Sequence, residues 1–334
     1  MFVPALFMLI VSDTRQQNIG PSRDDVQYWS LPTGSHVAFK CFTAGDSGKR
    51  ADVVFVHGGP GAYQVSEYTR GEAWYRKLAG LGFSVYLYDQ IGSGLSARLS
   101  DPAQYTVARH IADLEAIRVT INPERFILVG DSWGATLVAN YIASNPNKVA
   151  RAIFTSPGAI DPSEWTQSHS PTPRVSADFL TFVKDRRGEQ TSRRYEDLDA
   201  LLQSDVQSAY TEYPDSEMDP LMDQFIESIL HTTVHEVDLV RGMKFHGMGW
   251  WANIMIGWSA SNLRTNPRGT LSRDHTPVLI LKGDRDFLPE PMALQYQETF
   301  PQATLIRIGT AGHFIWLDKP HIYATLIEMF LLEH

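Results

Sequence analysis

The chain has 334 residues, of which 43% are hydrophobic and 20% are charged. This length and composition fit one large α/β domain that carries an insertion, or two domains. The formal net charge of −9 argues against a nucleic-acid partner, because no basic surface is available to neutralise phosphates. The single cysteine, Cys41, has no second cysteine for an intrachain disulfide or a cysteine-based metal cluster.

The N-terminal stretch, residues 1–11, is apolar except for Pro4, but about 20 residues are needed to cross a bilayer. It also lacks the basic region and the small-residue cleavage site of a secretory signal. We therefore expect residues 1–25 to form a terminal segment, apolar and then polar, without stable membrane insertion and in a cytoplasmic protein. A packed or interfacial segment, the remnant of a longer leader and a mis-assigned start remain alternative interpretations.

The first half of the chain alternates between strand and helix patterns. Two short stretches, residues 27–31 and 36–42, flank Pro32-Thr33-Gly34 and predict a β-hairpin at one edge of a sheet. The strands predicted after it are 52–56, 84–88, 126–129 and 152–156, and the predicted helices are 72–79, 107–121 and 135–144. This alternation predicts a mostly parallel sheet with helices on both faces.

The alternation stops at Pro157-Gly158 and resumes only at residue 278. Residues 161–270 carry helical patterns instead, at 195–210 and 221–231, which predicts a helical cap inserted between two strands of the core. The core then consists of residues 26–160 and 271–334. Its last predicted elements are strands 278–282 and 304–308 and helices 291–299 and 320–332.

A glycine-flanked serine lies between one of these strands and the next helix. The strand 126–129 runs into Gly130-Asp131-Ser132-Trp133-Gly134, and a helical pattern follows at once. G-x-S-x-G in this setting indicates the nucleophile elbow of an α/β-hydrolase. Gly130 and Gly134 remove side chains where strand and helix crowd together, so Ser132 can hold a strained backbone with an exposed hydroxyl. The sequence thus predicts an α/β-hydrolase fold with an inserted helical cap and with Ser132 as nucleophile.

A serine nucleophile needs a base and a carboxylate that holds the base in the correct tautomer. His313 follows the last predicted strand, and Asp284 and Asp286 follow the strand before it, which gives the α/β-hydrolase order of serine, acid and histidine. Asp284 lies closer to the strand end, whereas the third position after Gly283 is the usual one for the acid. We therefore favour Asp286 and keep Asp284 as the alternative.

The glycine-rich segment His57-Gly58-Gly59-Pro60-Gly61 follows the buried strand 52–56. Its backbone amides can point inward, and we expect the amide of Gly59 to join the amide of Trp133 in an oxyanion hole. A structural turn is the alternative, and His57 is expected to brace the loop rather than to take part in the chemistry.

Candidate substrate-binding residues are Gly58 and the cap tryptophans Trp250 and Trp251. An aromatic stripe of this kind lines a pocket in one interpretation and forms the core of the cap in the other. His231 and His235 have the spacing of metal ligands on a helix, but no third ligand accompanies them. We therefore expect no metal and no organic cofactor.

Three segments resemble motifs of the proline iminopeptidase family of α/β-hydrolases: His57-Gly-Gly-Pro-Gly61, Asp89-Gln-x-Gly-x-Gly-x-Ser96 and Gly-x-Ser-Trp-Gly134. The resemblance covers residues 50–160 and 275–334 approximately. It implies Ser132, Asp286 and His313 as the triad, and removal of an N-terminal residue, typically proline, as the activity. The elbow departs from the family pattern, because Asp131 stands where the family usually has glycine.

Three functions stay open at this point. The first is hydrolysis of a peptide, an amide or a small ester through an acyl-enzyme, in the manner of an iminopeptidase. The second keeps the triad but acts on an ester, lactone or thioester of a specialised metabolite. The third is a hydrolase fold used for ligand binding without catalysis. The expected partner is a small molecule or a short peptide, and the sequence makes no prediction of the oligomeric state.

Overall fold

The computed structural model of the chain describes residues 24–45, 48–164, 171–263 and 266–333. Its centre is an eight-stranded sheet with the strand order β1-β2-β4-β3-β5-β6-β7-β8. The strands are β1 (Gln27–Ser30), β2 (His36–Phe42), β3 (Ala51–Val56), β4 (Phe83–Tyr88), β5 (Phe126–Asp131), β6 (Val149–Thr155), β7 (Val278–Gly283) and β8 (Ala303–Ile308). Pairing is antiparallel from β1 to β2 and from β2 to β4, and parallel elsewhere. The predicted hairpin and the predicted, mostly parallel sheet are confirmed.

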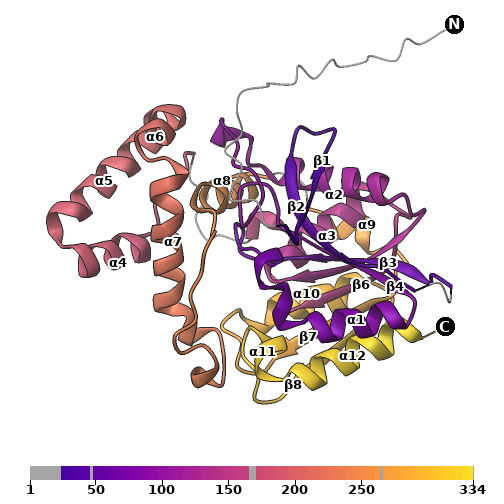
Figure 1. Cartoon of the computed structure of the whole chain (residues 1–334). Coiled ribbons are helices and arrows are strands. Elements are labelled where there is room, and N and C mark those ends of the chain that lie inside the picture. The colour runs from indigo at the N-terminus through magenta and orange to yellow at the C-terminus, as the bar shows by residue number, and fades with distance from the viewer. Residues whose placement is uncertain (1–23, 46–47, 165–170, 264–265, 334) are drawn as a thin grey trace, which may run out of the picture.

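Helices cover both faces of the sheet (Figure 1). The helices α1 (Glu72–Gly80) and α12 (Pro320–Leu332) pack on one face, and α2 (Val107–Ile121), α3 (Trp133–Ser144) and α10 (Glu290–Thr299) pack on the other. The side chains of β3 divide accordingly, because successive residues of a strand point to opposite faces. Val53 and Phe55 join the core under α1 and α12, whereas Val54 and Val56 join the core under α2 and α3.

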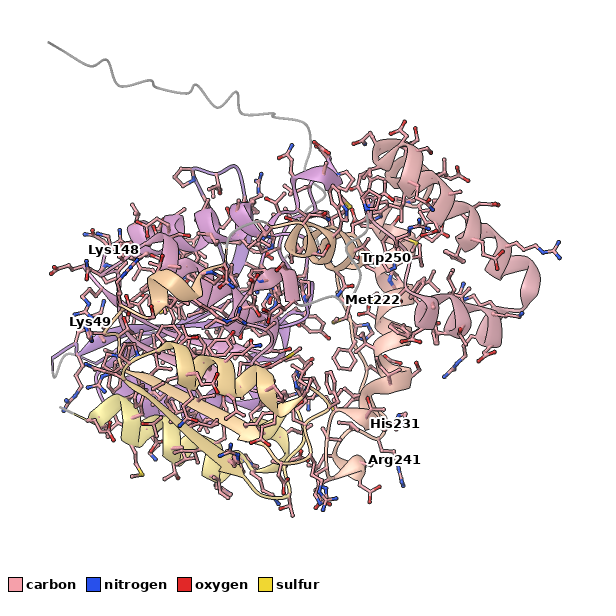
Figure 2. All side chains as sticks on the ribbon, turned by 180° about the vertical axis from the view of Figure 1, so that it is seen from behind. Lys49, Lys148, Met222, His231, Arg241 and Trp250 are labelled. Carbon is pink, nitrogen blue, oxygen red and sulfur yellow. The ribbon has the colours of Figure 1, made fainter. Side chains whose placement is uncertain are left out.

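The remaining α-helices come after β6 in the chain, either between β6 and β7 or after β8. The cap region contains α4 (Ala177–Arg187), α5 (Glu189–Ser204), α6 (Val206–Glu212), α7 (Asp215–Ile229) and α8 (Trp250–Ser261). Figures 1 and 2 show α4 to α6 standing away from the sheet, with α7 between them and the core. Short elements complete the fold: α9 (Arg268–Leu271), α11 (Ile315–Asp318) and the 3₁₀ turns Val65–Arg70, Pro102–Gln104, Pro162–Glu164, Leu230–Thr232 and Val237–Leu239.

Of two further predictions about local structure, one is wrong and the other lies almost entirely outside the described residues. The single helix predicted over 195–210 is wrong, because the chain breaks at Asp205, which has an extended backbone. The Asp205 carboxylate accepts hydrogen bonds from the backbone amides of Gln207 and Ser208 and so begins α6 as its N-cap. Of the predicted terminal segment 1–25, residues 1–23 lie outside the described residues. In the described part of the chain, no helix is both long and apolar enough to cross a bilayer.

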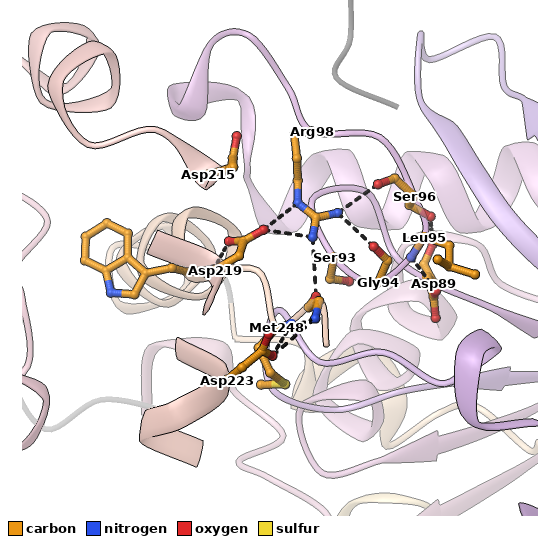
Figure 3. A network of polar contacts seen from close by, with 12 residues as sticks. Asp89, Ser93, Gly94, Leu95, Ser96, Arg98, Asp215, Asp219, Asp223 and Met248 are labelled. Atoms are coloured by element: carbon orange, nitrogen blue, oxygen red, sulfur yellow. Dashed lines mark hydrogen bonds and ion pairs between the residues drawn. The ribbon is translucent and has the colours of Figure 1, made fainter. Parts of the chain in front are cut away.

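A buried arginine ties the cap to the loop after β4 (Figure 3). The Arg98 guanidinium donates from Nε to Asp219 of α7 at 2.9 Å and from Nη1 to the backbone oxygen of Ser96 at 2.8 Å. The other Asp219 oxygen accepts the amide of Trp250 at 2.9 Å and so also holds the start of α8. Burial raises the pKa of the Asp219 carboxyl to about 7, and the charge of Arg98 opposes that shift. One guanidinium thus joins the core loop to two cap helices.

Replacing Arg98 by methionine should lower the free energy of unfolding by about 3–5 kcal/mol, because Asp219 would be left buried without its partner. Urea unfolding followed by circular dichroism measures this change. Arg174→Met is the matched control, since the Arg174–Asp199 pair lies in the same cap but the Arg174 side chain is 53% exposed. That variant should cost about 1 kcal/mol or less. Equal losses in the two variants would contradict the role assigned to Arg98.

Candidate active site

Ser132 sits at the junction of β5 and α3 in a backbone conformation that L-residues rarely adopt, with φ 55° and ψ −119°. Two glycines make the junction possible. A Cβ on Gly134 would lie 2.0 Å from the backbone oxygen of Val56, and one on Gly130 would lie 2.7 Å from the backbone oxygen of Gly134. Backbone hydrogen bonds fix the serine from both sides, from its amide to Thr155 at 2.9 Å and from the Gly158 amide to its oxygen at 3.1 Å. The strain of about 1–3 kcal/mol is thereby held by the surrounding structure.

His313 and Asp286 form a buried pair beside this serine. The Nδ1 atom of His313 lies 2.8 Å from Oδ1 of Asp286, and the two side chains are 4% and 0% exposed. Burial would raise the pKa of the Asp286 carboxyl, but the hydrogen bond from His313 and the charges of His313 and Lys282 hold it below its usual value. Asp284, the alternative acid, is exposed and accepts the backbone amide of Ala311 at 3.3 Å. The structure therefore brings Asp286, and not Asp284, to the histidine.

The loop that carries His313 is held by the core and by the cap. The backbone oxygen of His313 accepts the hydroxyl of Ser156 at 2.6 Å, and its amide donates to Thr233 of the cap at 2.7 Å. Asp318 of α11 accepts the amide of Gly312 at 2.7 Å. The position of the imidazole thus depends on Ser156, directly after β6, and on residues of the cap and of α11.

The loop with the predicted oxyanion-hole amide lies against the serine. A Cβ on Gly58 would come within 2.8 Å of the Ser132 Cβ, and Gly59 has φ +112°. His57 braces this loop: its Nε2 accepts the amide of Gln90 at 2.9 Å, and its Nδ1 lies 3.0 Å from the oxygen of Gly58. Burial lowers the pKa of His57 to about 4, so the ring is a neutral structural member of the loop near pH 7.

Because the pKa of His57 is lowered on folding, its neutral form contributes stability above pH 6.5 that is lost as the pH falls toward 4. Between pH 7 and pH 5 this loss should be about 2 kcal/mol in the free energy of unfolding. In His57→Gln, which retains an acceptor for Gln90 but does not titrate, the stability gap to the native protein should shrink by that amount over the same interval. Urea unfolding at the two pH values tests this, and a gap that stays constant would contradict it.

A cavity of about 410 Å³ connects these residues. Ser132, His313, Gly58 and Gly59 all line it. Its other walls are mainly apolar and come from the core and the cap: Phe55, Ala62, Tyr63, Trp74, Tyr75, Ile226, Ile229, Leu230, Met243, Phe245, Met248, Phe287, Phe314, Trp316, Pro320, Tyr323 and Ala324. The charged side chains in the lining are Glu67, Arg70, Asp131 and Lys244.

The structure places the two predicted tryptophans away from this cavity. Trp250 and Trp251 are 1% and 0% exposed, and their rings pack against Phe179 and Tyr210 inside the cap. The indole of Trp251 donates to the backbone oxygen of Tyr213 at 2.8 Å. Their aromatic stripe therefore forms the core of the cap, whereas the neighbouring side chains of Phe245 and Met248 reach the cavity.

Two charged residues of the site were not predicted as site residues from the sequence. Asp131 lines the cavity on the α1 side of β5 and accepts the hydroxyl of Thr155 at 2.7 Å, and burial raises the pKa of its carboxyl. Lys282 is buried at the end of β7 and contacts Asp286. The sequence signals were a carboxylate directly before the nucleophile and a single lysine in an otherwise apolar strand.

The pair His231 and His235 does not form a metal site with its surroundings. His231 is exposed in the turn after α7, and His235 lies 3.9 Å from the carboxylate of Glu236. Within the described ranges, no three His, Cys, Asp or Glu side chains gather in a way that could hold a metal ion.

Comparison with known proteins gives the family. A model of the alpha/beta hydrolase fold matches residues 53–320, which is more than half of the chain. The protein therefore belongs to the α/β-hydrolase fold family, and the predicted fold class and enzyme class are confirmed.

The relatives also bear out the resemblance to proline iminopeptidases. One from Heyndrickxia coagulans is 35% identical over 130 residues, which cover 37% of this chain and 41% of that protein. Another, from Lactobacillus delbrueckii subsp. bulgaricus, is 23% identical over 307 residues, which cover 91% of this chain and 97% of that protein. A solved structure described as a putative aryl esterase from Burkholderia cenocepacia matches with a TM-score of 0.61 at 17% identity, over 92% of this chain and 97% of that chain. At that identity the likeness concerns the fold alone.

Proposed function

We propose that the protein is a serine hydrolase in which Ser132 attacks the carbonyl carbon of a carboxylic ester or amide with an apolar acyl group. One observation carries this proposal. The strained serine opens onto the same cavity as a buried histidine whose Nδ1 is engaged by a carboxylate. That combination leaves the other ring nitrogen, Nε2, to act as the base.

The reaction begins when His313 Nε2 takes the proton of the Ser132 hydroxyl as the oxygen attacks the substrate. Asp286 holds the Nδ1 proton and stabilises the imidazolium that forms. The amides of Gly59 and Trp133 donate to the negatively charged oxygen of the tetrahedral intermediate. His313 then protonates the leaving group, and the acyl-enzyme on Ser132 is hydrolysed by a water molecule that His313 activates.

The cavity lining supports an apolar acyl group. Aromatic and aliphatic side chains from α1, α12 and the cap surround the serine, and each buried methylene of a substrate contributes about 0.8 kcal/mol. If all of that energy is realised in the transition state, kcat/KM should rise about fourfold for each methylene added to the acyl chain, until the cavity is full.

Release of an N-terminal residue is a second candidate function. Relatives named proline iminopeptidase support it, and it needs a carboxylate in the cavity to pair with the substrate ammonium. Glu227 of the cap does not fill that role, because its carboxylate binds Lys244 and the amide of Phe245. Asp131 favours this candidate, since its carboxylate lines the cavity beside the serine.

A single assay series separates these candidates: p-nitrophenyl esters of increasing acyl length beside prolyl p-nitroanilide. We expect ester turnover that increases with acyl length and falls by about 10³-fold or more in Ser132→Ala. Prolyl release that exceeds ester turnover, and that is lost in Asp131→Asn, would support the second candidate instead. Full activity of Ser132→Ala would contradict both, and a protein that neither turns over substrates nor reacts with a fluorophosphonate would be a ligand-binding member of the fold.

A further inference from the structure

A buried lysine contacts the side of the Asp286 carboxylate that faces away from His313. The Lys282 side chain is 5% exposed, and its Nζ lies 2.5 Å from Oδ2 of Asp286. The same Nζ donates to the backbone oxygen of Leu288 at 2.7 Å. In turn, the amide of Leu288 donates at 2.9 Å to Oδ1, the oxygen that His313 contacts. Lys282 therefore fixes both the carboxylate and the turn that carries it.

Burying the Lys282 ammonium costs folding free energy, which a role in the site would explain. A buried ammonium loses its hydration, and burial lowers the pKa of Lys282, although the charge of Asp286 opposes the shift. An apolar residue of similar length would fill the same space without that cost. Lys282 instead directs one hydrogen bond at Asp286, whose carboxylate contacts the histidine, and the other at the backbone oxygen of Leu288 in the same turn.

We propose that Lys282 is a positioning residue for His313: its ammonium orients the Asp286 carboxylate and offsets its negative charge, so that Asp286 holds the imidazole in place without holding it protonated. A lone buried carboxylate next to a histidine favours the imidazolium. The imidazolium cannot accept the serine proton. The positive charge of Lys282, on the far side of that carboxylate, offsets the negative charge of Asp286 that acts on the His313 ring. His313 therefore stays available as a base at lower pH. The inference rests on the proposed roles of Ser132, His313 and Asp286.

Other charged groups lie near His313 and Lys282, and a substitution at Lys282 leaves these groups in place. Asp131, from β5, acts on His313 by its charge, and its own pKa is raised by burial. Asp318, from α11, accepts the amide of Gly312 next to the histidine. Glu290, from α10, acts on Lys282. A difference between the native protein and a Lys282 variant therefore isolates the contribution of the ammonium.

The direct test is Lys282→Met, which keeps the length of the side chain and removes the charge. We expect the titration midpoint of the His313 imidazole, followed by NMR of ¹³C-labelled histidine and assigned by its loss in His313→Gln, to rise by about one pH unit. The midpoint of the acidic limb in the pH profile of kcat/KM, measured with the ester that is hydrolysed fastest, should move to higher pH by the same amount. Turnover at pH 6, relative to pH 8, should then fall up to about tenfold.

Two further variants separate this role from structural support. Lys282→Gln retains a hydrogen-bond donor without a charge and should show the same upward shift, which also provides the test if the methionine variant does not fold. Ile280→Val weakens packing in the same buried strand and should move neither midpoint. An unchanged or lowered midpoint in a folded Lys282 variant would overturn the inference. The NMR titration needs no substrate, so a shifted midpoint in a protein without Ser132-dependent turnover would support Lys282 and contradict the proposed function alone.

Discussion

The site depends on the close approach between the start of α3 and the ends of the neighbouring strands. The 2.0 Å that would separate a Cβ on Gly134 from the oxygen of Val56 leaves no room for any side chain but hydrogen. This contact brings the serine at the turn to the same edge of the sheet as the loop after β3. Because parallel strands end at one edge, the loops after β3, β7 and β8 meet there as well. Gly58, Asp286 and His313 are consequently gathered around Ser132 by the sheet itself.

The cap supplies part of the cavity wall and part of the support for the His313 loop. The cap's Arg98–Asp219 contact with the core fixes the position of α7 and the start of α8. Phe245 and Met248, in the segment between these two helices, form part of the cavity wall. Thr233 of the cap also accepts the amide of His313. The cap therefore has two connections to the site, one through the walls of the cavity and one through the loop of the proposed base.

Most of the fold follows from the sequence because its signals are local. The apolar strand before Gly130, the helix pattern after it and the placement of Asp286 and of His313 shortly after a strand each depend on a few neighbouring residues. The break at Asp205 was not predicted, because helical spacing alone does not reveal that a carboxylate will cap the next helix. The placement of Trp250 and Trp251 depends on which side of α8 meets the cap helices, which is a tertiary property. Lys282 and Asp131 acquire their surroundings only when β5, β7 and the His313 loop come together.

The central claim is that Ser132 forms a covalent acyl intermediate through the His313–Asp286 pair. Intact-protein and peptide mass spectrometry after brief exposure to a p-nitrophenyl ester tests it most directly. The account predicts an added acyl mass on the peptide that contains Ser132, formed quickly in the native protein and lost in both Ser132→Ala and His313→Gln. Ester turnover without such an adduct, or an adduct on another residue that persists in Ser132→Ala, would contradict the account.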